Sequence, residues 1–164
     1  MPNRPRRRVV ASLVALSSVP AIALVAANQS TANGSESMTL QFRGSTFDMV
    51  DVPPTSTDPE APPSPGDYFV LSNKLFRDGE RVGSLFATCL FPKTVSDPAS
   101  IPLLCTGSYK LPGGTLVGNA LLRSDDPVNR IAITGGTGRY AGMTGTATEY
   151  PRDDESGRVV IDIQ

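Results

Sequence analysis

From Gly66 to its C-terminal end, the chain is a succession of short apolar runs separated by turn-forming residues. β-Branched and aromatic residues fill the runs, and Gly, Pro, Asp or Asn interrupt them about every ten residues, which is typical of an all-β protein. No segment shows the apolar spacing of an amphipathic helix. The sequence predicts strands near Tyr68–Phe76, Arg81–Phe91, Ile101–Lys110, Thr115–Arg123, Asn129–Thr134, Met143–Tyr150 and Arg158–Ile163, and one more within Met38–Val52.

These eight short strands, joined by short turns, favour a single closed antiparallel β-barrel. Asp78-Gly79 is the dipeptide of a tight hairpin, and Pro112-Gly113-Gly114 also predicts a chain reversal. Closure of the barrel removes exposed sheet edges. A barrel of this size is either filled by side chains or holds one small ligand.

The predicted strand Arg81–Phe91 is apolar on both faces, so both faces are expected to be covered. On the inside this pattern indicates a core or an apolar cavity. On the outside it indicates a subunit partner, and therefore a homo-oligomer, either a dimer or a trimer. One face carries Leu85, Ala87, Cys89 and Phe91, and the other carries Val82, Phe86 and Leu90.

Residues 1–27 have the pattern of a secretory signal peptide. A head with four arginines precedes an apolar stretch, Val9–Ala27, which ends in small residues. A membrane anchor is the alternative, since a span needs about 20 apolar residues, but Pro20 and the Val25-Ala26-Ala27 end favour cleavage. Arg7-Arg8 leaves a twin-arginine export signal open. We therefore expect a secreted protein with no stable membrane insertion after cleavage.

The mature chain is expected to begin with a disordered polar tail, residues 28–37, followed by one barrel domain, residues 38–164. Six prolines fall between Pro53 and Pro65. Proline has no amide hydrogen to donate to a sheet, so residues 52–66 are predicted to form a long surface loop.

Composition excludes several classes of function. Loss of the four arginines of the signal leaves 11 basic and 16 acidic residues, a net charge of −5 without any basic cluster. Nucleic-acid binding needs clustered Lys and Arg, so it is not expected. The chain has no His, which excludes Ser-His-Asp and Cys-His nucleophile systems as well as His-ligated metals. We expect no metal and no cofactor.

The chain has two cysteines, Cys89 and Cys105. An even number of cysteines in an exported chain predicts a disulfide. Closing a loop of about 15 residues is worth roughly 3 kcal/mol in the chain-entropy model.

The glycine-rich stretch Thr134–Gly142 formally fits a dinucleotide-binding fingerprint, G-x-G-x-x-A. That fingerprint needs a following helix and strand with an acid about 20 residues further on, for which the chain is too short. We interpret the stretch as a structural glycine loop that turns the chain at one end of the barrel. Its glycines are Gly135, Gly136, Gly138 and Gly142.

Three motifs follow one another in the order found in one known family. They are Gly66-Asp67 with Ser72-Asn73-Lys74-Leu75-Phe76, Arg81-Val82-Gly83 with Thr88-Cys89-Leu90, and Ala132-Ile133-Thr134-Gly135-Gly136-Thr137-Gly138 with Tyr140 and Gly142. On these motifs, residues 66–150 resemble the allene oxide cyclase barrel family, a relative of the dirigent proteins. The paired cysteines and Gly-Gly-Thr-Gly-Arg-Tyr look most like the bacterial exported members.

The resemblance implies an eight-stranded antiparallel barrel, often trimeric, with an apolar cavity. Plant members cyclise an unstable fatty-acid epoxide without a cofactor, and some bacterial relatives close polyketide rings by cycloaddition. In both, the barrel folds a flexible apolar substrate into one reactive shape, which is catalysis by proximity and orientation.

The resemblance also implies candidate catalytic residues. Asn73 matches a cavity asparagine that helps to hold a polarising water; the alternative is a buried amide bonded to backbone. Cys89 matches a cavity cysteine; the alternative is the Cys89–Cys105 bridge, which leaves no thiolate. Plant members carry a catalytic Glu on the first strand, where this chain offers only Asp48 and Asp51, which we interpret as solvated acids. The expected cavity-lining residues are Phe69, Leu71, Leu75, Leu85, Ala87 and Phe91.

Three functions are compatible with these observations. The first is a cofactor-free cyclase or isomerase acting on an apolar small molecule derived from a polyketide or a fatty acid. The second is a non-catalytic barrel, dirigent-like or lipocalin-like, that binds a lipophilic ligand. The third is a surface module whose barrel is filled by side chains and whose apolar outer face serves assembly.

Overall fold

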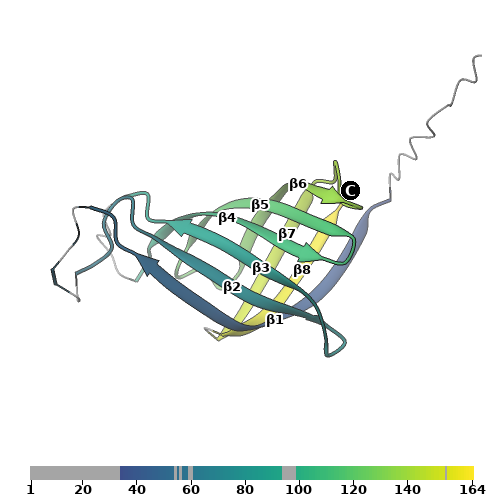
Figure 1. Ribbon diagram of the computed structural model, residues 1–164, viewed down its shortest axis with the longest axis horizontal. Coiled ribbons are helices and arrows are strands. Elements are labelled where there is room, and N and C mark those ends of the chain that lie inside the picture. Colours follow the sequence, from purple (N-terminus) through teal and green to yellow (C-terminus); the bar gives the residue numbers. More distant parts are fainter. Residues whose placement is uncertain (1–33, 54, 56, 59–60, 94–98, 154) are drawn as a thin grey trace, which may run out of the picture. The chain divides into compact units, whose positions relative to one another are not determined.

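The computed structural model describes residues 34–164 apart from 54, 56, 59–60, 94–98 and 154. Within these residues, eight antiparallel strands close into one barrel, in which each strand pairs with the next and the last returns to the first (Figure 1). This confirms the predicted all-β fold. The strands are β1 (Glu36–Val50), β2 (Tyr68–Arg77), β3 (Glu80–Leu90), β4 (Pro102–Leu111), β5 (Gly114–Arg123), β6 (Asn129–Gly138), β7 (Gly145–Asp153) and β8 (Ser156–Ile163).

The tight turns lie where the turn-forming dipeptides predict them. Between β2 and β3, Asp78 and Gly79 both have positive φ, +52° and +85°. Two consecutive positive φ angles match the twist of the flanking strands, which is why Asp-Gly is favoured here. Between β4 and β5, Gly113 adopts φ +89°, a region that glycine enters without steric cost.

Several strand boundaries differ from the predictions: β7 ends at Asp153 rather than Tyr150, β8 begins at Ser156 rather than Arg158, and two further differences have a clear cause. β1 begins at Glu36, inside the segment expected to be a disordered tail, because Glu36 and Ser37 pair with Ile163 and Asp162 of β8. β6 continues past Thr134 to Gly138, so Gly135, Gly136 and Gly138 are strand residues paired with β5 rather than loop residues. Gly142, with φ +78°, lies in the turn that follows. The predicted signal peptide, residues 1–27, and residues 28–33 lie outside the described residues.

Gly136 shows why glycine is needed inside β6. A Cβ at this position would lie 2.7 Å from the carbonyl oxygen of Thr115 and 2.7 Å from that of Tyr140. Contacts this short do not occur between real Cβ atoms and backbone, so β6 can approach its neighbours this closely only without a side chain. Tyr140, whose backbone lies against Gly136, is buried in the core and 3% exposed.

The barrel interior is divided into a packed half and a hollow half. Buried apolar side chains pack together in one half, and in the other half the inward-facing residues leave a cavity, described below. The packed half contains Met38, Leu40, Leu75, Leu111, Leu116, Ile133, Tyr140, Ala147, Val159, Ile161 and Ile163, all buried.

The proline-rich connection between β1 and β2 is anchored by Asp67. Its carboxylate accepts hydrogen bonds from the backbone N–H of Val52, at 2.9 Å, and from the backbone N–H and hydroxyl of Ser64. Its backbone carbonyl accepts from the N–H of Phe91 at 2.8 Å. The buried side chain of Asp67 therefore holds the two ends of the loop together, and its backbone carbonyl ties them to Phe91, which follows β3.

Candidate functional site

The cavity lies in the hollow half of the barrel and has a volume of about 310 Å³. It is lined by the last residues of β1, β3, β5 and β7 and the first residues of β2, β4 and β6, so it opens toward the end of the barrel where these strands are connected. Its walls are largely apolar. The apolar side chains on it include Phe47, Phe69, Leu71, Leu85, Ala87, Leu103, Ala120, Leu122 and Ile131.

Four of the six residues expected to line a cavity do so: Phe69, Leu71, Leu85 and Ala87. Leu75 lies in the packed half and is fully buried. Phe91 is buried next to the cavity wall, where its ring meets the ring of Phe69 edge-on with 6.1 Å between centroids.

Asn73 lies on the cavity wall and is 5% exposed. Its side-chain carbonyl oxygen accepts a hydrogen bond from the hydroxyl of Ser45 on β1. Because this bond uses the oxygen of the amide, the two N–H donors of Asn73 are the groups that an oxygen of a ligand would meet.

Ser45 faces the cavity because β1 contains a bulge. The register between β1 and β2 shifts between Arg43 and Thr46, and Gly44 has φ +65°. A glycine with positive φ is the usual first residue of such a bulge, which turns the following side chains to the other face. Phe42 faces the interior before the bulge, and Ser45 and Phe47 face the cavity after it.

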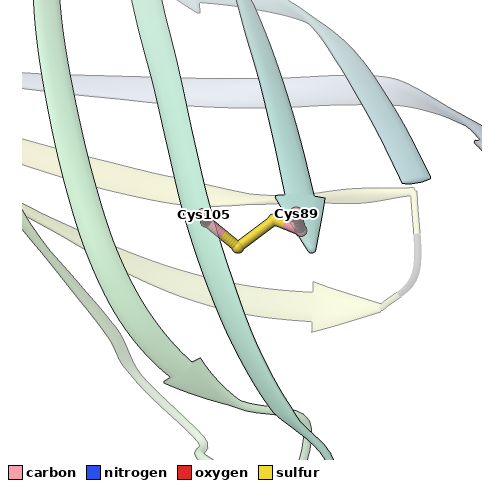
Figure 2. Close-up of a disulfide and its surroundings, with 2 residues drawn as sticks. All are labelled: Cys89 and Cys105. Carbon is pink, nitrogen blue, oxygen red and sulfur yellow. A yellow bond between two sulfur atoms is a disulfide. The ribbon is translucent and has the colours of Figure 1, made fainter. Parts of the chain in front are cut away.

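Cys89 and Cys105 are joined by a disulfide and both line the cavity. They are directly opposite each other on β3 and β4, with 4.1 Å between their Cα atoms (Figure 2). A bridged sulfur is neither a nucleophile nor a thiolate. Cys89 therefore has no thiol with which to act in this structure, and contributes to the wall of the cavity instead.

A hydrogen bond crosses the barrel at the floor of the cavity. The hydroxyl of Tyr109 on β4 donates to Oε1 of Glu149 on β7 at 2.9 Å, although these strands are separated by β5 and β6. Tyr109 is 2% exposed, and it shares its level in the barrel with Asn73, since both pair in register with Leu85. The floor of an otherwise apolar cavity is therefore polar.

Burial determines the ionisation of this pair. It raises the pKa of the Glu149 carboxyl, although hydrogen bonds from Tyr109 and from the side chain of Asn129 oppose the rise. The pKa of Tyr109 is raised well above its ordinary value by burial, and further by the adjacent Glu149, so the phenol stays neutral.

Glu149 was missed by the sequence reasoning, which searched for an acid on the first strand. Asp48 and Asp51 are not among the residues that line the cavity, and Asp48 is exposed on β1. The signal that identifies Glu149 is the alternation of β7: the buried Ala147 faces inward, so Glu149, two residues later, faces inward as well.

Two further observations concern metal binding and membrane-spanning helices. Among the described residues, no three His, Cys, Asp or Glu side chains are grouped so that they could hold a metal ion. The same part of the chain contains no helix long and apolar enough to span a membrane.

Comparison with known proteins finds a matching family model and several solved structures with a similar fold. A family model described as "allene oxide cyclase barrel like domain" matches residues 49–161. No curated protein matches the chain. Solved structures do match. A pyocyanin demethylase is 23% identical with a TM-score of 0.65, and the match covers 79% of this chain and 100% of that one.

Two further structures have other activities in their names. The Diels-Alderase AbmU from Streptomyces koyangensis is 18% identical with a TM-score of 0.62, and the match covers 78% of this chain and 63% of that one. The pterocarpan synthase dirigent protein GePTS1 is 20% identical with a TM-score of 0.54, over 79% and 83% of the two chains. At these identities the likeness concerns the fold alone.

Proposed function

Because the chain belongs to the allene oxide cyclase barrel-like family, we propose that its cavity binds an apolar small molecule and promotes its cyclisation or isomerisation without a cofactor. One observation carries the proposal: a cavity of about 310 Å³ with apolar walls has buried polar groups at its floor. Such a cavity can hold a polyketide-derived or fatty-acid-derived molecule in one folded shape, which lowers the entropic part of the barrier to ring closure.

Asn73 is the residue we assign to polarisation of the substrate. With its carbonyl oxygen bonded to Ser45, its N–H groups can donate to an oxygen on which negative charge develops, directly or through a water. Cys89 is not assigned a chemical role, because its sulfur is bridged to Cys105.

A second candidate function is a non-catalytic barrel, dirigent-like or lipocalin-like, that binds a lipophilic ligand unchanged. The absence of an acid on β1 that faces the cavity favours this alternative over the chemistry of the plant enzymes. The third function, a barrel filled by side chains, is disfavoured by the open cavity.

Incubation of the protein with a lipophilic extract of its host, followed by liquid chromatography and mass spectrometry, separates the two candidates. A compound that changes its retention time at constant mass supports cyclisation or isomerisation. A compound that co-purifies unchanged, with no such conversion, contradicts the enzyme and supports the binding barrel.

For a compound that is converted, Asn73→Ala is expected to lower kcat about 100-fold, since removal of one donor to a developing oxyanion has an effect of that order. The matched control is Asn119→Ala, because Asn119 is exposed on the outside of β5 and bonds Thr134. Equal loss in the two variants, or none in Asn73→Ala, would contradict the assigned role.

We also propose that the protein is exported. The disulfide is compatible with an oxidising compartment, and the arginine head and apolar stretch of residues 1–27 have the form of a signal peptide. N-terminal sequencing of the protein from its host should give a chain that starts at Asn28. An uncleaved chain in the membrane fraction would instead support the anchor.

A further inference from the structure

The hydrogen bond between Tyr109 and Glu149 has features of a chemical site rather than of a structural one. It joins non-adjacent strands across the interior, and both residues line the cavity. The carboxyl of Glu149 also accepts a hydrogen bond from the side chain of Asn129. In the arrangement that the structure shows, both partners donate, which stabilises the carboxylate and leaves the O–H of a protonated acid without an acceptor.

A protonated Glu149 therefore needs an acceptor for its own O–H. The carboxyl borders the cavity, which is where an oxygen atom of a ligand would lie. The hydroxyl of Tyr109 can also rotate to accept from Glu149 and then donate its own proton into the cavity. In either arrangement the pair presents one O–H group to the ligand.

We infer that Glu149, positioned by Tyr109 and Asn129, is the proton donor of the cavity, and that the ligand is an apolar molecule with a hydrogen-bond-accepting oxygen at its buried end. A carbonyl, an epoxide or an ether oxygen meets this requirement. The inference rests on the proposed function, because it specifies the substrate class of the same cavity.

This arrangement permits an isomerisation in which Glu149 lends a proton to the substrate and takes one back. The O–H bond of Glu149 breaks as its proton bonds to the substrate oxygen, and the carboxylate that remains is held by the Tyr109 and Asn129 donors. The same proton returns to Glu149 when the rearranged product is deprotonated. The isomerisation therefore consumes no oxidant, reductant or cofactor.

The other ionisable groups on the cavity lie toward its mouth. They are Arg123 on β5, Asp126 in the following turn and Asp153 at the end of β7. The guanidinium of Arg123 is paired with Asp125, with 3.3 Å from Nε to Oδ1. In register beside Glu149, Asn129 on β6 and Val159 on β8 carry no ionisable group. Tyr109 is thus the titratable group bonded directly to Glu149.

The test uses two probes of nearly equal shape, acetylnaphthalene and isopropenylnaphthalene, of which only the ketone has an accepting oxygen. Their affinities for the protein are measured by calorimetry on both sides of the titration of Glu149. That titration is followed by infrared spectroscopy of the carboxyl band that is lost in Glu149→Gln. With Glu149 protonated, the ketone should bind about two- to tenfold more tightly, the range of one hydrogen bond.

Ionisation of Glu149 should reduce this preference to the part that the N–H groups of Asn73 supply, because a carboxylate has no proton to donate. Glu149→Gln keeps an N–H donor of similar shape, so its preference should not change with pH. Tyr109→Phe removes a bond that stabilises the carboxylate, so the preference should persist to higher pH than in the wild type. Glu80→Gln, an exposed acid at the start of β3, is the control and should behave as the wild type.

The outcomes separate this inference from the function on which it rests. Equal binding of the two probes at every pH would overturn the inference and leave an apolar-ligand cavity intact. A preference for the ketone that is the same in the wild type at both pH values would also overturn it. Failure of both probes to bind would overturn the proposed function together with the inference.

Discussion

Asp67 shows how one side chain can fix a loop of more than ten residues. Hydrogen bonds from the backbone N–H groups of Val52 and Ser64, in that order of importance, lower the pKa of its carboxyl, and the partial burial of the group opposes them. A carboxyl with a lowered pKa in the folded state stabilises the fold above its unfolded pKa, and this contribution is lost as the pH falls through the folded value.

Asp67→Asn is therefore expected to lower the midpoint of thermal unfolding at neutral pH, since the amide replaces a charged acceptor by a weaker neutral one. The difference from the wild type should shrink as the pH falls below the ordinary pKa of Asp. Calorimetric scans of both proteins over an acidic-to-neutral pH series measure this. Asp48→Asn, at an exposed position near the end of β1, is the comparison. A constant difference at all pH values would contradict the role of the Asp67 charge.

At the same scale, Asn73 and Glu149 illustrate what a sequence can and cannot predict. Asn73 was identified through its motif, and the structure places it on the cavity wall. The hydrogen bond from the Ser45 hydroxyl to the carbonyl oxygen of Asn73 was not predictable, because Ser45 faces inward only through the bulge at Gly44. Glu149 precedes Tyr150-Pro151 at the polar end of its strand, where an acid is usually solvated. Its contact with Tyr109 of β4 becomes visible only when the barrel is closed.

Among the elements, the hairpin of β3 and β4 is held by the disulfide. The two cysteines are 16 residues apart, so the bridge should stabilise the protein by about 3 kcal/mol through the entropy of the unfolded chain. We expect the free energy of unfolding of the double variant, Cys89→Ser with Cys105→Ser, to be lower by this amount. The variant should therefore unfold at a lower denaturant concentration. A reductant should destabilise the wild type and leave the double variant unchanged. Equal stability of the oxidised wild type and the double variant would contradict this contribution.

The pairing of β5 and β6 depends on glycines that leave room for the neighbouring backbone, and Gly136 is one of them. Gly136→Ala is expected to destabilise the fold by about 1–3 kcal/mol, because its Cβ would meet the carbonyl oxygens of Thr115 and Tyr140. Gly135→Ala is the matched control on the same strand, since its Cβ would have nothing within 4 Å. Chemical denaturation of the two variants measures the difference. Equal losses of stability in the two variants would contradict a steric cause and point to the backbone conformation of glycine instead.

The elements themselves were largely predictable, because each strand ends at a residue with a definite turn preference. The exceptions have physical causes. The sequence alone assigns a run such as Thr134–Gly138 to a loop, since glycine has low strand propensity. In the barrel it becomes strand, because pairing with β5 supplies the hydrogen bonds and the close approach excludes larger residues.

For the whole molecule, the outer face of β2–β5 is the feature that a solitary barrel would not explain (Figure 1). Tyr68, Leu90, Leu104 and Leu121 lie in one row across these strands, and Ser72, Phe86, Ser108 and Val117 lie in a second. The row between them consists of Val70, Thr88, Thr106 and Asn119. None of these twelve outward positions carries a charge, although Leu121 is 71% exposed and Phe86 and Leu104 are each 50% exposed.

An uncharged face with this much exposed apolar surface is typical of a site of protein association. We expect a second copy of this chain to cover it, because the same face occurs on every copy and two uncharged faces can meet without leaving a charge buried. Leu121→Arg should therefore convert an oligomer into a monomer in sedimentation experiments. Thr146→Arg, which adds the same charge to an exposed position on β7, should leave the oligomer intact. A wild-type protein that sediments as a monomer at high concentration would contradict self-association through this face, and in that case the cavity of each barrel would have to act alone.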